Sequence, residues 1–401
     1  MRAKGLMVCA SRQHVGKTTS SLAITSGLLK RFQAEMHVSC NMQPTHRAPQ
    51  KVGFIKPVGQ RHVRVGPEML PSGATEGLRV DKDVVLFKEH FNLTSCEYRE
   101  MSPVVIPNGY TRDFLDGKIK EDDQIHAIKE SYASIEAKNE FVVVEGTGHC
   151  GVGSIVNMDN ARVASLLGLD IIFVVNGGLG SAFDELALNR LMCEHHGVKI
   201  RGVLVNKVKP DKLDMITEYF TKALKRWDIP LVGVVPDASY LSAPTMVDYE
   251  QLFSTKLLCG EGQKLSHFNQ TTLVAMELSS FIERLHNEKH SKTLFVTHAS
   301  RVDIILGFIA HGAVHQEMWG APWRAGLILA GENQNQLDSA LLATLKDQSC
   351  PILHAPMSTY DAMLQLTNYT AKLSALDKQR TTAAIEHYEP HINFEAVLHE
   401  A

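Results

Sequence analysis

The stretch Ala10-Ser11-Arg12-Gln13-His14-Val15-Gly16-Lys17-Thr18-Thr19 decides how the first half of the chain folds. It follows an apolar run at residues 6–10 that predicts a short buried strand, and it precedes residues 20–32, whose apolar side chains recur at helical spacing. A strand, a tight loop, Gly-Lys-Thr and a helix are the parts of a phosphate-binding loop. We therefore expect residues 13–19 to hold phosphate through backbone N–H groups, with Lys17 at the terminal phosphates and Thr18 on magnesium.

One position departs from the usual pattern of such a loop. Five residues before the Gly-Lys pair, where glycine is usual, the chain has Ser11. The strand before the loop, the helix after it and the second threonine, Thr19, still favour phosphate binding. The alternative is a chance Gly-Lys-Thr at the start of an ordinary helix.

Length and composition limit the class of protein. A chain of 401 residues is too long for one compact core, so we expect two or three domains. The hydrophobic share of 44% and the charged share of 21% are typical of a globular protein. The net charge of −3 gives no general attraction to nucleic acid or to anionic membranes, and no apolar run approaches the roughly 18 residues of a membrane span.

The cysteines and the start of the chain bear on the compartment. The seven cysteines are scattered singly, which predicts neither a disulfide framework nor a zinc site. The first predicted strand begins at about residue 6, too early for a signal peptide. We therefore expect a cytoplasmic protein with no nucleic-acid or membrane partner.

Further apolar runs predict strands that alternate with helices up to residue 246. These runs lie at residues 51–55, 141–144, 170–175, 200–205 and 231–235. Buried strands separated by helices of ten or more residues predict right-handed crossovers in a parallel sheet. The expected fold of residues 1–246 is therefore α/β, a doubly wound and mostly parallel sheet. Residues 61–80, rich in Gly, Pro and Arg, are expected to form a loop.

Polar side chains follow two of these strands directly. Lys56 ends the run at residues 51–55, and Glu145 ends the run at residues 141–144. Ligands of an open α/β sheet bind at the carboxyl ends of its strands, so Glu145 is a candidate magnesium ligand and Lys56 favours an anionic group. The alternative for Lys56 is that it only holds a neighbouring carboxylate such as Glu145.

Other candidates have a structural explanation at this stage. Asp81 and Asp83 open a helix predicted at residues 84–91, and helix capping explains them as well as ligand binding does. His149 and Cys150 are adjacent, so their side chains point in different directions and we expect no catalytic dyad.

The second half of the chain predicts a separate domain. Periodicity fades after residue 246, and we expect a linker at residues 247–271, a small α/β domain at residues 272–390 and a tail at residues 391–401. Helices are predicted at residues 272–285, 302–310, 336–345 and 360–366, and strands at residues 292–297, 325–330 and 351–355. This domain shows no second phosphate loop and no convincing acid–base cluster.

Six motifs, taken in order, resemble the dethiobiotin synthetase family, a P-loop fold that phosphorylates a carbamate with ATP and closes a ring. They span residues 5–246 and are the loop at 10–19, Lys56-Pro57-Val58, Val144-Glu145-Gly146, Leu179-Gly180, Val205-Asn206, and Pro236 through Pro244-Thr245. The resemblance implies ATP and Mg²⁺ as cofactors.

The resemblance also implies roles for single residues. Lys17 contacts the β- and γ-phosphates, Lys56 faces the carbamate, and Asn206 recognises adenine. The implied magnesium ligands are Thr18, Asp83 and Glu145, with Asp81 a rival to Asp83 because the spacing is one residue off.

Two departures lie where the family's diamino acid substrate would sit. Gln60 stands in place of a serine, and residues 181–184 replace a polar stretch. The nucleotide half of the resemblance therefore carries over better than the substrate half.

A closer resemblance covers more of the chain. Residues 83–86, 102–106 and 109–112 look like the dethiobiotin synthetase-like N-terminal region of long phosphate acetyltransferases. In those proteins a domain named DRTGG follows, and residues 272–390 resemble it through residues 300–304 and 325–329, although the naming pentapeptide is absent. The acetyltransferase catalytic domain has no counterpart in these 401 residues, so we expect no acetyl transfer from them.

Three functions follow from these patterns. The favoured one is a nucleotide-dependent regulator or sensor with a Mg-ATP site and an unidentified small anionic substrate or effector. Its DRTGG-like module is expected to pair with itself, which gives a homo-oligomer, or with a partner. The second is an ATP-dependent enzyme, either a ligase that activates a carboxylate or carbamate or an ATP hydrolase. The third is a scaffold whose phosphate loop is vestigial.

Overall fold

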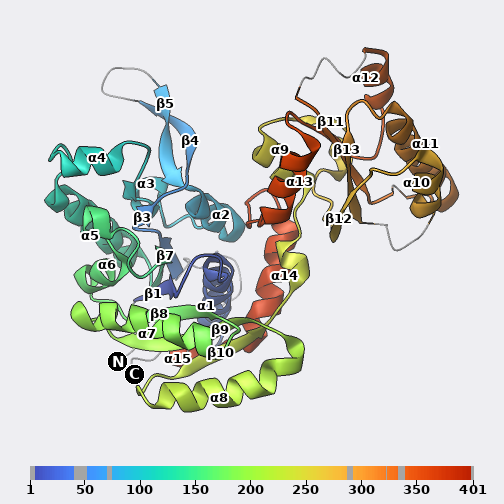
Figure 1. Cartoon of the computed structure of the whole chain (residues 1–401). Coiled ribbons are helices and arrows are strands. Elements are labelled where there is room, and N and C mark those ends of the chain that lie inside the picture. Colours follow the sequence, from blue (N-terminus) through green and yellow to red (C-terminus); the bar gives the residue numbers. More distant parts are fainter. Residues whose placement is uncertain are drawn as a thin grey trace. The chain divides into compact units, whose positions relative to one another are not determined.

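The computed structural model describes residues 5–39, 52–69, 75–286, 292–321, 323–332 and 339–398. They form two compact units, shown in Figure 1. Unit 1 comprises Met1–Ala238 together with Leu373–Ala401, and unit 2 comprises Ser239–Lys372. Unit 2 is therefore inserted into the chain of unit 1, which resumes after it.

Unit 1 is built on a parallel sheet with the strand order β10-β9-β8-β1-β7-β2. Its strands are β1 (Gly5–Ala10), β2 (Val52–Ile55), β7 (Phe141–His149), β8 (Ile171–Asn176), β9 (Ile200–Val208) and β10 (Leu231–Pro236). Their apolar runs are mostly buried, as expected of strands covered on both faces. The strand order reverses at β1, and such folds bind ligands at the carboxyl ends of the strands at that point. The doubly wound fold expected for this half of the chain is confirmed.

Helices surround this sheet, and two short strand pairs lie beside it. The helices are α1 (Lys17–Ser39), α2 (Lys82–Phe91), α3 (Tyr98–Met101), α4 (Tyr110–Leu115), α5 (Glu121–Lys138), η1 (Ser154–Val156), α6 (Asn160–Leu167), α7 (Gly180–His195), η2 (Pro210–Lys212), α8 (Leu213–Lys225), α14 (Lys378–Tyr388), η7 (Glu389–His391) and α15 (Phe394–Leu398). The strand pairs are β3 (Val58–Gly59) with β6 (Val104–Val105), and β4 (His62–Met69) with β5 (Thr75–Asp81).

The prediction of a loop at residues 61–80 is wrong, because β4 and β5 form an antiparallel pair there. Apolar residues face each other across the pair, with Val63 opposite Val80 and Val65 opposite Leu78. Gly66, at a φ of 58°, lies in a register irregularity between the two halves of β4. The glycine that suggested a loop therefore accommodates a bulge within a strand.

The C-terminal segment, residues 378–398, departs from the expected domain order. It was expected to end the second domain and form a tail, but it belongs to unit 1. Its helix α14 packs against α1, and Ile392 forms an antiparallel bridge with Gly233 of β10. Phe394 is buried beside α1, where a β-carbon on Gly27 would lie 2.1 Å from the phenyl ring.

Unit 2 is a smaller α/β sandwich with the strand order β11-β15-β14-β13-β12. Its strands are β11 (Leu257–Cys259), β12 (Gln270–Leu273), β13 (Thr293–His298), β14 (Gly326–Ala330) and β15 (Ile352–Ala355). Its helices are η3 (Ser239–Ser242), α9 (Met246–Phe253), η4 (Glu261–Gln263), α10 (Leu278–Leu285), α11 (Val302–Trp319), α12 (Ser339–Leu345) and α13 (Thr359–Asn368). Only β11 runs antiparallel to its neighbour among the described strands of this sheet.

Alternation along the strands of unit 2 produces two apolar layers. Phe295 and Leu327 belong to one buried cluster, while the next residues along, Val296 and Ile328, belong to the other. Successive side chains of a strand point to opposite faces, so the sheet has a packed layer on each side. The smaller α/β domain expected after the P-loop domain is confirmed.

The expected linker at residues 247–271 is wrong, because this stretch holds most of α9, all of β11 and the start of β12. The helix expected over residues 272–285 begins only at Leu278 for the same reason. A capping box marks the start of α9: the Thr245 hydroxyl accepts from Asp248 N, and the Asp248 carboxylate accepts from Thr245 N. This Thr-x-x-Asp signal was present in the sequence. The predicted start at residues 336–338 of a later helix lies outside the described residues.

Candidate functional site

The loop between β1 and α1 has the backbone expected of an anion-binding turn. His14 and Gly16 adopt positive φ angles of 64° and 91°. A β-carbon on Gly16 would lie 2.2 Å from Asn206 Nδ2, so this position needs glycine. Ser11, the departure from the usual pattern, has no positive φ; its hydroxyl donates to Glu185 Oε2 at 3.1 Å. The loop therefore accommodates serine without strain at that point.

Polar side chains of this loop contact Glu145, which lies in the middle of β7. The side chain is fully buried. Its Oε1 accepts from Lys17 Nζ at 2.7 Å and from Thr18 Oγ1 at 3.1 Å. Lys17 Nζ also donates to the carbonyl oxygen of Gly146. The structure thus brings together Lys17, Thr18 and Glu145, three of the side chains that the sequence analysis selected.

A second lysine joins the same carboxylate to the start of α2. Lys56 Nζ lies 3.4 Å from Glu145 Oε1 and 3.1 Å from Asp81 Oδ1, and it also pairs with Asp83 Oδ2. Asp81 is in addition the N-cap of α2, since its Oδ1 accepts from Asp83 N at 2.9 Å. Helix capping, one of the two explanations for Asp81, is therefore confirmed, and the same side chain also contacts Lys56.

Burial and charge oppose each other in this cluster. Burial by itself would raise the pKa of Asp83, but the Lys56 ammonium holds the pKa of that carboxyl well below its usual range. Burial by itself would lower the pKa of Lys56, but its carboxylate neighbours raise that pKa above its ordinary value. Burial raises the pKa of Asp81, and Lys56 offsets this only in part. Lys56 and Asp83 are therefore charged at neutral pH.

The donor set can be compared with what magnesium requires. Glu145 Oε2 is buried and has no hydrogen-bond partner among the described residues. An orphaned carboxylate oxygen beside the Thr18 hydroxyl fits a hard cation that keeps several waters and takes one or two carboxylates. Within the described ranges no group of three or more His, Cys, Asp or Glu could hold a metal by itself. The residues therefore fit magnesium carried in with phosphate better than a resident metal.

Asn206, selected as an adenine contact, lies against the phosphate-binding loop. It is fully buried, its Nδ2 donates to Val15 O at 2.7 Å, and its Oδ1 accepts from Lys207 N at 2.8 Å. Lys207, which the sequence analysis did not select, donates from Nζ to His14 O at 2.9 Å. Two successive residues of β9 thus hold two carbonyl groups of the loop.

Other candidates do not join the site. Cys150 is buried with its Sγ 3.8 Å from Cys193 Sγ, whereas His149 is exposed. The contact with Cys193 raises the pKa of the Cys150 thiol, so the absence of a dyad expected at this pair agrees with the geometry. Gln60 is exposed after β3.

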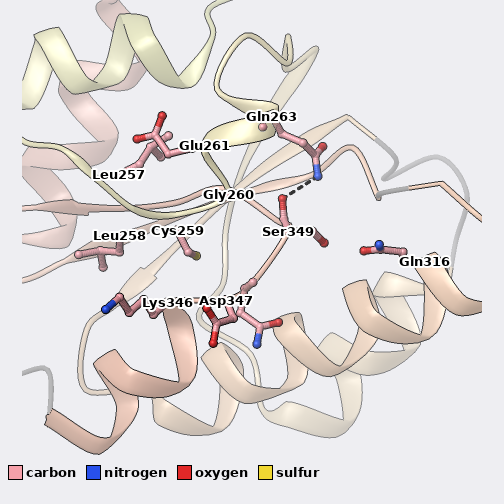
Figure 2. A pocket seen from close by; sticks show the side chains of 12 residues that line it. Leu257, Leu258, Cys259, Gly260, Glu261, Gln263, Gln316, Lys346, Asp347 and Ser349 are labelled. Carbon is pink, nitrogen blue, oxygen red and sulfur yellow. Dashed lines mark hydrogen bonds between the residues drawn. The ribbon is translucent and has the colours of Figure 1, made fainter.

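Unit 2 contains a hollow of about 450 Å³, shown in Figure 2. It is bordered by residues 257–263 and 346–349, together with Gln316. Gln263 is buried and donates from Nε2 to Ser349 O at 2.9 Å, which ties the two borders together. Glu261, Lys346 and Asp347 on its rim are exposed, so this hollow offers no desolvated charge for catalysis.

Two known families match the chain, and the boundary between their matches lies close to the start of unit 2. The AAA_26 family, described as an AAA domain, matches residues 4–245, and the DRTGG domain family matches residues 250–369. The phosphate acetyltransferase of Nitratidesulfovibrio vulgaris is 24% identical over 88% of this chain and 47% of its own length. A probable cobyric acid synthase of Methanococcus maripaludis is 27% identical over 60% of this chain and 47% of its own.

These matches confirm the resemblance to the N-terminal region of long phosphate acetyltransferases. The chain spans about half the length of the curated relatives it matches. The MinC:MinD cell division protein complex of Aquifex aeolicus aligns with 60% of this chain and 83% of its own, with 15% identity and a TM-score of 0.33. In the part of the chain that the structure describes, no helix is both long and apolar enough to cross a membrane.

The ion cluster predicts the effect of removing Lys56. Lys56→Met should lower the free energy of unfolding by about 3–5 kcal/mol at pH 7, because buried carboxylates lose their cation. In the native protein the low pKa of Asp83 contributes stability above its unfolded pKa of about 3.9, and this contribution is lost as the pH falls further. The difference between variant and native protein in urea unfolding should therefore shrink below about pH 4.

The exposed Lys222, which pairs with Glu218 on α8, provides the matched control. Lys222→Met should change stability by less than about 0.5 kcal/mol. If Lys56→Met were equally harmless, Lys56 would not serve to hold these carboxylates.

Proposed function

Since this chain belongs to the AAA domain family AAA_26, we propose that unit 1 binds a magnesium–ATP complex at residues 13–19 and that the protein is a nucleotide-dependent regulator or sensor. The observation that carries the proposal is the convergence of Lys17 and Thr18 on Glu145, whose second oxygen is buried without a partner in the described structure. A loop with this backbone supplies N–H groups to phosphate. In the proposed complex, Lys17 turns from Glu145 to the β- and γ-phosphates.

The metal would be held by Thr18 and Glu145, with Asp83 completing the set directly or through water. At these residues bound magnesium would supply neutralisation of phosphate charge. In the described structure the positive charges of Lys17 and Lys56 balance the negative charge of Glu145. In the proposed complex the metal would take over this role at Glu145, and the phosphates would take over Glu145's role toward the lysines. Asp81, the N-cap of α2, remains the rival of Asp83 for this role.

The contacts of Lys56 favour sensing over chemistry. Lys56 is occupied by three carboxylates, as in the alternative that it only holds its neighbours. We propose that unit 2, the DRTGG domain, provides self-association and that a small anionic effector acts on the protein in the cytoplasm.

The ligase alternative rests on the position of Lys56 beside the loop. A lysine next to the terminal phosphate can face a carboxylate or carbamate once its own partners move, and relatives of this chain include proteins named as synthases. In that case Lys17 and Lys56 are the catalytic residues. The scaffold alternative requires that the loop bind no nucleotide at all.

Lys17→Ala should weaken Mg-ATP binding at least about a hundredfold, because the charge-assisted contact with the terminal phosphates is lost. The native fold should persist at lower stability, because Lys56 still pairs with Glu145 after the Lys17 partner is lost. Isothermal calorimetry measures the affinity, and Lys118→Ala, which removes an exposed lysine beside α4, is the control. Unchanged affinity in Lys17→Ala would mean that this loop is no nucleotide site.

Asp83→Asn and Glu145→Gln should weaken ATP binding chiefly when magnesium is present, because each variant removes a charged oxygen without changing shape. ATP affinity should be measured across a magnesium titration and again with EDTA present. A weaker affinity only when magnesium is available indicates a lost metal ligand, whereas a weaker affinity under both conditions indicates a general loss of ATP binding. An effect of Asp81→Asn in place of Asp83→Asn would transfer the metal role to Asp81. Magnesium dependence equal to that of the native protein in all three variants would leave these acids purely structural.

The chain should form no measurable dethiobiotin from diaminopelargonate, carbon dioxide and ATP, even when ATP binds. Gln60 replaces the small hydroxyl of the family, and each lost polar contact costs on the order of 1–3 kcal/mol. Product formation followed by mass spectrometry, together with phosphate release, is the measurement. Efficient turnover would make the ligase alternative the better account.

A further inference from the structure

The C-terminal segment is anchored to the elements that carry the phosphate-binding loop. His387 donates from Nε2 to Pro236 O at 2.9 Å, and Glu389 Oε2 lies 2.7 Å from Lys30 Nζ on α1. The guanidinium of Arg31 stacks over the Phe394 ring at 3.8 Å. These contacts hold the segment against α1 and against the carboxyl end of β10.

Tyr388, the last residue of α14, reaches the loop itself. The side chain is buried, with 5% exposed. A β-carbon on Gly16 would lie 3.3 Å from the Tyr388 hydroxyl oxygen, and the same β-carbon would meet Asn206. Tyr388 and Asn206 therefore approach the same turn of the loop, although they are far apart in the sequence.

The described side chains on the two sides of the loop differ, which gives the site a charged end and an opposite end at β9 and β10. The charged groups Lys56, Asp83 and Glu145 lie on one side of the loop, on β7 and next to β2 and α2. Asn206 and Pro236 lie on the other side, on β9 and β10. A nucleotide whose terminal phosphates and metal face the charged end must extend its nucleoside toward β9 and β10, where the C-terminal segment lies.

We infer that the C-terminal segment forms one wall of the nucleoside end of the site and that Tyr388 is a nucleotide-binding residue there. This inference rests on the proposed nucleotide binding and adds a residue that no motif contains. An aromatic side chain with a hydroxyl offers a base or ribose both an apolar face and a hydrogen-bonding group.

The inference links the site to unit 2 through the chain. Pro236, held by His387, comes just before unit 2 begins at Ser239, and the C-terminal segment follows soon after unit 2 ends at Lys372. Both ends of the inserted unit are thus joined to residues beside the nucleoside end. A nucleotide held against this wall would therefore contact a segment that is tied to both connections to unit 2.

The test compares ATP with inorganic tripolyphosphate, which has phosphates but no nucleoside, on the full chain by calorimetry in magnesium. Tyr388→Ala should weaken ATP binding at least about fivefold and Tyr388→Phe about two- to fivefold, because the first removes an aromatic wall and the second a hydroxyl. Neither variant should change tripolyphosphate affinity. Tyr219→Ala, on the exposed surface of α8, should alter neither ligand.

Hydrogen exchange gives a readout that needs no variant. ATP should slow exchange in peptides covering residues 378–398 of the native chain, and tripolyphosphate should not. The inference is overturned if Tyr388→Phe and Tyr388→Ala bind ATP as the native chain does, if they lose ATP and tripolyphosphate equally, or if both ligands protect the segment alike. Failure of the native chain to bind either ligand would instead reject the proposed nucleotide binding itself.

Discussion

A fully buried carboxylate, Glu145 in the middle of β7, is the constraint around which unit 1 is arranged. An ionised carboxylate without water needs cations and hydrogen-bond donors at short range. Lys17 and Thr18 reach it from the start of α1, and Lys56 reaches it from the end of β2. One oxygen atom, Glu145 Oε1, therefore links the loop, β7 and β2. Lys56 extends this link to the start of α2.

The parallel sheet makes this convergence possible. Because β2, β7 and β1 are neighbours with a common direction, Lys56 after β2 and the loop after β1 can both reach Glu145 within β7. The glycine next to Glu145 serves close approach: a β-carbon on Gly146 would lie 2.8 Å from Asn160 Oδ1 and 3.0 Å from Cys9 Sγ. Glycine at this position thus lets the backbone pack closely against Asn160 and Cys9.

The errors of sequence interpretation have separate physical causes. Glycine and proline within residues 61–80 predict a loop, but the alternating Val63 and Val65 pair there as part of β4. Fading periodicity predicts a linker where α9 lies, although the Thr-x-x-Asp capping box of that stretch indicates a helix. Chain order predicts that the C-terminal segment belongs to the second domain, but an inserted domain makes chain order differ from spatial order.

The sequence by itself determined the P-loop between a strand and a helix, the buried strands, the succession of two α/β units and the kinship with phosphate acetyltransferase N-terminal regions. These depend on local periodicity and on motifs a few residues long, which a linear reading contains. Only the tertiary structure decided that Lys56 pairs with Asp81, Asp83 and Glu145, and that Tyr388 lies against Gly16. Those contacts join residues far apart in the chain, and strand order and the return of the chain after an inserted unit bring them together, which no local pattern records.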